Sequence, residues 1–299
     1  MIEPTDDPTA FAAAVGEWLA PRARYTVLAT VLDGILHGRH ADPPPRFAVV
    51  RDGEGAVSGA ALRTPPWPLL CTEVDPAQVD PFLDVWLAHD PGLAGASGPP
   101  ATVRAIGDAW CRRTGGTHRL QTAMALHALE SVTDPPHPTT GLLRLAGPAD
   151  EDTVLAWSLA FDAEAHGHDD PRRGEELGRA LLSGGRAYVW DDGGAPVSFL
   201  GHTIAVDGIQ RIGPVYTPPE CRGHGYAGHA VAELSRRLLA GGARRCVLNT
   251  DLANPTSNKI YAEVGYRRFA EWETRAFVPP GAQDAPVAGQ TAAESPTTG

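Results

Sequence analysis

The sequence predicts an α/β protein in which two halves each layer helices on strands. Segments with helical spacing alternate with short strand-like segments as far as residue 278. A stretch rich in Pro and Thr, TDPPHPTTG at 133–141, has the composition of a linker and separates the halves. The chain has 299 residues and is 42% hydrophobic, so each half is long enough to bury a core of its own.

The first half begins with a predicted helix at 8–20. A hairpin is predicted at 46–62, because the turn sequence Asp-Gly-Glu-Gly interrupts two apolar runs. The other predicted elements of this half are a short strand at 69–74, a helix at 76–90, a glycine-rich strand at 92–98, a helix at 101–116 that ends at its glycines, and a long strand at 118–129.

The second half begins with a predicted strand at 141–147 and a helix at 148–167, whose acidic first turn suits the helix dipole. Three antiparallel strands are predicted within 186–217, because DDGG and VDG supply tight turns between them. The other predicted elements are helices at 171–185, 227–242 and 256–265 and strands at 244–252 and 266–278. Residues 279–299 have no large apolar side chain beyond one Val, which predicts a disordered tail.

Composition argues against several classes of function. The formal net charge of −11 argues against a nucleic-acid partner, since such binding needs clustered Lys and Arg. The four cysteines are scattered without a CxxC spacing, which favours reduced thiols in a cytoplasm. No stretch has the length and apolarity of a membrane span, and no secretion signal opens the chain. We therefore expect a soluble, cytoplasmic protein.

The stretch ECRGHGYAGHAVAEL at 220–234 places several glycines directly before a helix. The first backbone N–H groups of a helix have no partner within it and lie at the positive end of its dipole, where a diphosphate can bind. Glycine lets the backbone approach phosphate oxygens closely, although a plain turn would have the same composition. The loop lacks the Gly-Lys-Ser/Thr of a Walker loop, and it follows antiparallel strands instead of opening a dinucleotide-binding β-α-β unit.

Two motifs in this half resemble those of the GNAT superfamily, the acyl-coenzyme A dependent N-acyltransferases. Arg222-x-x-Gly225-x-Ala227 resembles the family's Q/R-x-x-G-x-G/A motif, and NPTSNKIYAEVGY at 254–266 resembles its second signature. The resemblance implies that residues 139–278 form a catalytic GNAT domain, with a mixed, mainly antiparallel sheet flanked by helices. The order of elements in residues 1–138 is similar to a degenerate GNAT repeat without the phosphate motif, as in tandem-GNAT proteins.

The resemblance also implies a cofactor and a set of site residues. Acetyl-CoA would be the co-substrate, and no metal would be needed. Val215 and Thr217 would pair main chain to main chain with the pantetheine arm, and Asn254 would contact that arm. Tyr261 would be the general acid that protonates the leaving thiolate. The pyrophosphate would be held by backbone amides of Arg222, Gly223, His224, Gly225, Tyr226, Ala227 and Gly228.

Each of these side chains also has a structural alternative. Tyr261 could pack against Val264 on its short helix, Arg222 could be a solvated arginine, and Asn254 could cap the helix that Pro255 begins. Pro214 has no N–H to give to a strand ladder, which favours a bulge or an opening where the family's two cofactor-binding strands part.

No general base stands out in the sequence. The strand before the loop, GIQRIGPVYT, has no carboxylate, and the nearest candidates are His202, Asp207 and Glu220. His166 and His168 have no second cluster at ligand spacing, so we expect them to line the acceptor site rather than to bind a metal. The predicted reaction is direct attack of a small-molecule or peptide amine on the thioester. The alternative is a non-catalytic acyl-CoA-binding or regulatory module.

Overall fold

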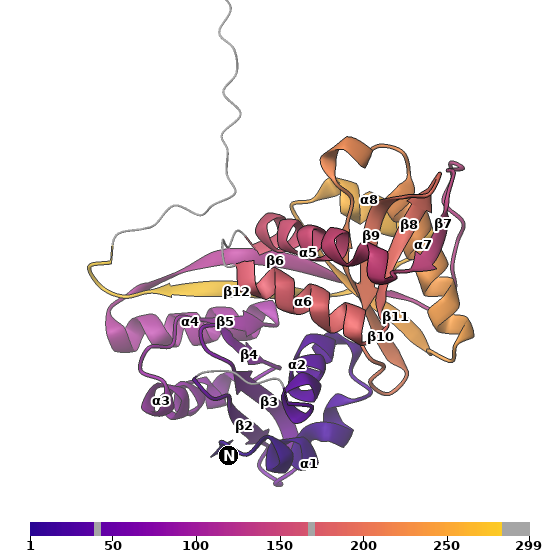
Figure 1. The fold of residues 1–299 in the computed structure, drawn as a ribbon. Coiled ribbons are helices and arrows are strands. Elements are labelled where there is room, and N and C mark those ends of the chain that lie inside the picture. The colour runs from indigo at the N-terminus through magenta and orange to yellow at the C-terminus, as the bar shows by residue number, and fades with distance from the viewer. Residues whose placement is uncertain (39–42, 167–170, 283–299) are drawn as a thin grey trace, which may run out of the picture.

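The computed structural model of the chain describes residues 1–38, 43–166 and 171–282. It confirms the predicted α/β fold: helices cover both faces of a mixed, 12-stranded sheet (Figure 1). The strand order is β1-β2-β3-β4-β5-β12-β6-β11-β10-β9-β8-β7. The predicted disordered tail lies outside the described residues from 283 onward.

The first half contains every element that the sequence predicted for it, and two more. Helix α2 and the short edge strand β1 occupy segments for which the sequence predicted no element. The elements are β1 (Ile2–Thr5), α1 (Pro8–Leu19), a 3₁₀ turn (Ala23–Tyr25), α2 (Thr26–Leu36), β2 (Arg46–Arg51), β3 (Val57–Arg63), β4 (Leu69–Cys71), a 3₁₀ turn (Pro76–Gln78), α3 (Val79–His89), β5 (Gly95–Gly98), α4 (Pro100–Thr114) and β6 (Thr117–Leu129).

The second half follows the predicted order closely, and its three middle strands are antiparallel as expected. The elements are β7 (Leu142–Leu145), a 3₁₀ turn (Pro148–Asp150), α5 (Glu151–His166), α6 (Pro171–Ser183), β8 (Ala187–Asp192), β9 (Ala195–His202), β10 (Ile209–Tyr216), a 3₁₀ turn (Pro219–Cys221), α7 (Tyr226–Ala240), β11 (Arg245–Asp251), α8 (Pro255–Val264) and β12 (Arg267–Val278). No helix in the described ranges has the length and apolarity that crossing a membrane requires.

The alternation of side chains along β6 shows which helices cover which face of the sheet. Leu129 packs into a cluster with α7 and α8, whereas Leu126 packs into a cluster with α1 and α2. Residues an odd number of positions apart on a strand point to opposite faces, so these two helix pairs lie on opposite sides of the sheet.

The two halves exchange their last strands. Strand β6 of the first half lies between β11 and β12, and β12 of the second half lies between β5 and β6. The exchange makes the centre of the sheet symmetric about the β6–β12 pair. Beyond β12 lie β5 and β4, which are parallel to each other, and beyond β6 lie β11 and β10, which are also parallel to each other. The ranges 1–138 and 139–278 remain a prediction of the domains, because one sheet runs through both.

Polar contacts hold β12 in the first half's part of the sheet. Trp272 donates a hydrogen bond from Nε1 to Ser97 Oγ at 2.8 Å, and that hydroxyl lies 2.8 Å from Thr274 Oγ1. Glu273 is paired with Arg104 and Arg275. Burial raises the pKa of the Glu273 carboxyl, but hydrogen bonds from the two arginines outweigh burial and leave that pKa below its ordinary value.

Candidate functional site

The sheet opens between β10 and β11. These parallel strands pair only where they begin, with Ile209–Arg211 opposite Arg245–Val247. Beyond that point β10 continues to Tyr216 and β11 to Asp251 without pairing to each other. On its other side, the register of β10 against β9 shifts between Ile212 and Val215, which agrees with the bulge expected at Pro214. The two strands therefore part at their carboxyl ends.

The entrance to α7 directly follows β10, and its backbone donors are free. Gly223 and Gly225 have φ of 84° and 82°, a left-handed conformation that favours glycine. In the part of the chain that the structure describes, no group accepts a hydrogen bond from the six backbone N–H groups of residues 223–228. Six consecutive free donors at the positive end of a 15-residue helix are an arrangement that can bind an anion.

The surface over these amides is open. A Cβ atom built on Gly223 would meet nothing within 4 Å, and one on Gly225 would come no closer than 3.8 Å, to His229. Gly228 lies deeper, because a Cβ there would meet Ile260 of α8 at 3.5 Å. A ligand can thus reach the main chain at the two outer glycines, while Gly228 is where α7 and α8 come together.

The side chain of Arg222 lies across the outside of the loop. Its Nη2 bonds both carboxylate oxygens of Glu164 on α5, at 2.8 and 3.0 Å, and its Nε donates to Thr217 O at 2.9 Å. These bonds tie the loop to α5. A direct contact between this guanidinium and a phosphate stays a prediction.

Val215 and Thr217 lie at the end of β10, beside the opening. Val215 pairs with Leu200 of β9, so the other edge of β10 faces the opening. The Thr217 hydroxyl lies 2.9 Å from Ser198 Oγ and is therefore engaged within the protein. Val215 therefore offers main chain to the opening, as pairing with an extended ligand arm requires, whereas the Thr217 carbonyl already accepts from Arg222.

Helix α8 follows β11 and places Asn254 and Tyr261 at the other strand of the opening. The Oδ1 atom of Asn254 accepts from the Ser257 N–H at 3.0 Å, so this residue caps the helix as the sequence alternative proposed. Among the described residues nothing accepts from its Nδ2, which leaves that donor for a ligand.

Tyr261 is 8% exposed, and burial raises its pKa to about 12, so its hydroxyl is protonated at neutral pH. Its ring meets that of Tyr266 edge to face, with the centroids 6.1 Å apart. The two phenols differ in their hydrogen bonds. The Tyr266 hydroxyl lies 2.9 Å from Ser235 Oγ, whereas no residue in the described ranges is bonded to the Tyr261 hydroxyl.

Residues 152–266 match the sequence family described as the acetyltransferase (GNAT) family. This part of the chain belongs to the GNAT superfamily. No curated protein matches the sequence. Solved structures of similar fold cover nearly the whole chain, so the GNAT assignment and the fold agree.

A GCN5-related N-acetyltransferase from Sphaerobacter thermophilus is 16% identical, with a TM-score of 0.59 over 94% of this chain and 97% of that one. A Drosophila protein is 12% identical, with a TM-score of 0.61 over 93% and 98%. A tandem GNAT protein from the clavulanic acid biosynthesis pathway is 16% identical, with a TM-score of 0.53 over 95% and 100%. At these identities the likeness concerns the fold.

The three candidate bases, His202, Asp207 and Glu220, lie at different distances along the chain from the opening between β10 and β11. Asp207 pairs with Arg244 in the turn before β10, at the end of that strand away from the opening. Glu220 is exposed in the turn after β10. His202 pairs with Ile212, next to the opening, but burial lowers its pKa and its Nδ1 lies 2.9 Å from Thr203 O. Of the three, only His202 lies beside the opening, and its lowered pKa keeps the imidazole neutral, the form that can accept a proton.

His166 and His168 cannot be placed at an acceptor site, because their side chains lie outside the described residues. In the ranges 1–38, 43–166 and 171–282, no three His, Cys, Asp or Glu side chains gather as a metal site would require.

Sequence reasoning missed the groups that surround the glycine-rich loop at residues 222–228. Tyr226, predicted only for its amide, donates from its hydroxyl to Asp192 Oδ2 at 2.6 Å. The linker threonines Thr139 and Thr140 bond His224 O and Asp192 Oδ2 at 2.9 and 2.8 Å. The sequence gives no signal of these three hydrogen bonds, because each joins residues far apart in the chain. The separations are 85 residues for Thr139 and His224, 52 for Thr140 and Asp192, and 34 for Asp192 and Tyr226.

Proposed function

We propose that the chain is an N-acetyltransferase, in which an amine acceptor attacks acetyl-CoA directly in a ternary complex. The observation that carries the proposal is the row of six free backbone N–H groups at residues 223–228, beside the opening between β10 and β11. The diphosphate of coenzyme A suits those donors, and the free edge of β10 near Val215 suits the pantetheine arm. The thioester would then lie in the opening, near Tyr261 of α8.

In this arrangement the chain's residues orient the donor and supply one proton. The neutral amine attacks the thioester carbonyl carbon, the carbon–sulfur bond breaks, and the amide forms as the amine nitrogen loses a proton. The free hydroxyl of Tyr261 donates a hydrogen bond and its proton to the departing sulfur. Because β10 has no carboxylate from Ile209 to Tyr216, we propose that the amine proton leaves through water and that a proton from solvent restores the Tyr261 phenol.

Calorimetric titration with coenzyme A tests the site. Gly225→Trp places a large side chain over the free amides and should lower affinity at least tenfold. Gly55→Trp is a matched control in the β2–β3 turn. Gly55 also has a left-handed φ, of 86°, and a Cβ atom there would meet nothing within 4 Å. Equal affinity in wild type and Gly225→Trp would remove the assignment.

A non-catalytic acyl-CoA-binding module is the second candidate, and one observation favours it: β10 has no carboxylate from Ile209 to Tyr216. Incubation with radiolabelled acetyl-CoA and polyamines, amino acids, aminoglycosides and peptide N-termini separates the two. Label in any amine supports the enzyme. Tight binding of coenzyme A without transfer to any of them supports the module.

We also propose a cytoplasmic location. All four cysteines are free thiols, and Cys71 and Cys246 are buried, which suits a reducing compartment.

A further inference from the structure

The segment that links the two halves crosses the outer surface of α7 and is held there by polar contacts. Thr133 N donates to Val264 O at 2.8 Å, at the end of α8. Asp134 pairs with Arg236 at 2.6 Å, and His137 O lies 2.7 Å from His229 Nε2. Beyond these points, Thr139 and Thr140 reach the phosphate loop and the end of β8.

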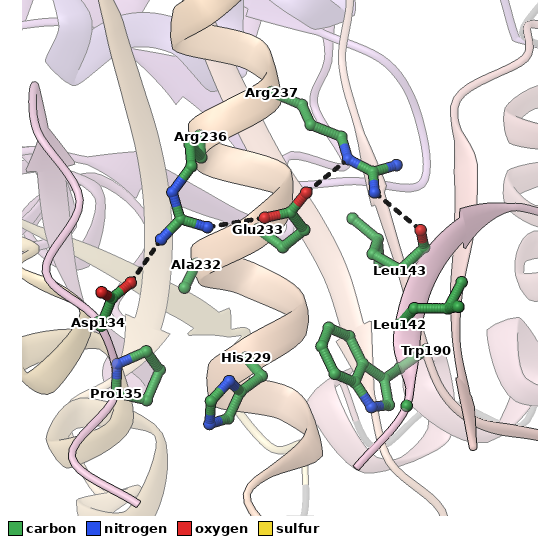
Figure 2. A pocket seen from close by; sticks show the side chains of 11 residues that line it. Asp134, Pro135, Leu142, Leu143, Trp190, His229, Ala232, Glu233, Arg236 and Arg237 are labelled. Carbon is green, nitrogen blue, oxygen red and sulfur yellow. Dashed lines mark hydrogen bonds and ion pairs between the residues drawn. The ribbon is translucent and has the colours of Figure 1, made fainter. Parts of the chain in front are cut away.

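The linker is not packed closely onto the helix between these contacts. A cavity of about 250 Å³ lies between it, α7 and β7 (Figure 2). Figure 2 shows Asp134, Arg236, Glu233 and Arg237 joined across the cavity in one chain of ion pairs that ends at Leu143 O. Beside this cavity the linker is held by hydrogen bonds and ion pairs to α7.

The contact of Thr139 acts on the geometry of the phosphate loop. Its hydroxyl donates to His224 O, so this carbonyl points toward the linker. In a planar trans peptide the C=O and the following N–H point in opposite directions. Fixing His224 O on the linker side therefore turns the N–H of Gly225 to the other side, where it is free. This peptide borders Gly225, whose left-handed φ shows the freedom of glycine, and it would otherwise rotate at little cost.

A second anchor holds the same turn from the end of β8. Asp192 Oδ2 accepts from the Tyr226 hydroxyl at 2.6 Å and from the Thr140 hydroxyl at 2.8 Å. The His224 ring stacks on that of Tyr226, with centroids 5.5 Å apart. The residues on either side of Gly225 are thus both tied to the linker, one directly and one through a carboxylate.

We propose that Thr139 is a positioning residue for the cofactor: the linker between the halves presets the amide of Gly225 toward the diphosphate. The inference rests on the proposed function, since it concerns the same site. It makes the linker part of the cofactor site rather than a passive connection, with preorganisation of a backbone donor as the physical effect.

The test is calorimetric titration of the full-length protein with coenzyme A. Thr139→Val keeps the shape of the side chain and removes the donor to His224 O. We expect the Kd of coenzyme A to rise about five- to tenfold, the effect of losing roughly one hydrogen bond. Thr139→Ser restores the hydroxyl and should bring the Kd back to within about twofold of wild type. Thr30→Val is the matched control, since Thr30 also donates to a backbone carbonyl, Val27 O at 3.0 Å, on α2.

The outcomes separate the two proposals. If wild type binds coenzyme A and Thr139→Val binds it with the same Kd, the inference is overturned and the proposed function stands. The same holds if Thr139→Val raises the Kd and Thr139→Ser raises it equally. A wild-type protein that does not bind coenzyme A would overturn both. Melting temperatures of all variants should agree within about 2 °C, because a lost surface hydrogen bond costs little stability. A larger drop confined to Thr139→Val would mean that Thr139 serves stability instead.

Discussion

Replacing Tyr261 by Phe separates a catalytic role for its hydroxyl from a packing role, because the neighbouring Tyr266 offers a matched control. Both phenols are at least nine-tenths buried, and their rings are in contact. Only the Tyr266 hydroxyl has a hydrogen-bond partner among the described residues, Ser235 Oγ at 2.9 Å. Deleting an unbonded hydroxyl removes no interaction from the folded protein, so stability should change by less than about 0.5 kcal/mol in Tyr261→Phe.

The same deletion in Tyr266→Phe removes a buried hydrogen bond. Ser235 Oγ keeps its bond to Val231 O at 2.7 Å, so it is not left unsatisfied, and the expected loss is near the net value of about 1 kcal/mol. That loss corresponds to a fall in melting temperature of roughly 2–4 °C.

The two variants should show opposite patterns in activity. Tyr261→Phe should lower turnover about 100-fold or more, the usual contribution of a general acid, while the Kd of coenzyme A stays within twofold. Tyr266→Phe should keep nearly full turnover. Turnover is measured as release of free coenzyme A with the acceptor that the amine panel identifies. Thermal unfolding of both variants is measured in parallel. Wild-type turnover in Tyr261→Phe, or equal loss in both variants, would refute the reasoning.

Three further predictions follow from the fold. The pKa of Glu273 in the folded protein is lowered from its ordinary 4.5, so the stability that the ionised carboxylate contributes is present above pH 4.5 and is lost as pH falls through the folded-state pKa. The melting temperature should therefore fall more steeply from pH 7 to 3 in wild type than in Glu273→Gln. Gly223→Ala should cost about 1–2 kcal/mol by denaturant unfolding, since φ is 84° and no atom obstructs the methyl group, while Gly53→Ala should cost almost nothing. A fragment starting at residue 139 should be insoluble alone and recovered when co-expressed with residues 1–138, which supply β6; a soluble, coenzyme A-binding fragment would contradict this.

Much of the fold could be predicted from the sequence, because its signals are local. The turn residues DDGG and VDG mark two hairpins, and Asn254 before Pro255 marks the start of α8. Helix α2 was missed although Leu28, Ala29 and Leu32 have helical spacing, because TVLATVLDGIL is rich in β-branched residues, which are also typical of strands. The structure places Leu28 and Leu32, four residues apart, on the face of α2 that packs into the core.

The exchange of β6 and β12 could not be predicted. Nothing local in either strand specifies its partner, since β6 pairs with β11 and β12, both more than a hundred residues away. The site divides in the same way. The glycines and Tyr261 could be found, because a motif with fixed spacing specifies them. The partners that orient them could not, since the pairings of Arg222 with Glu164 and of Thr139 with His224 exist only after the chain has folded.

The strand exchange shows how the first half can contribute to the opening although it has no counterpart of the glycine-rich loop at 222–228. Its counterpart of the open pair is β4 and β5, which are parallel like β10 and β11. There the strands are closed: a Cβ on Gly98 would meet Cys71 O at 2.7 Å and Cys71 Sγ at 2.8 Å, too near for any side chain and leaving no space for a ligand arm. Yet β6 from this half pairs with β11 along Cys246–Asp251, on the edge of β11 away from the opening. With β6 in place, β11 is held by the sheet on one side and can part from β10 on the other. The first half therefore contributes a rigid wall to the opening in the second, and its own closed strands are compatible with that role.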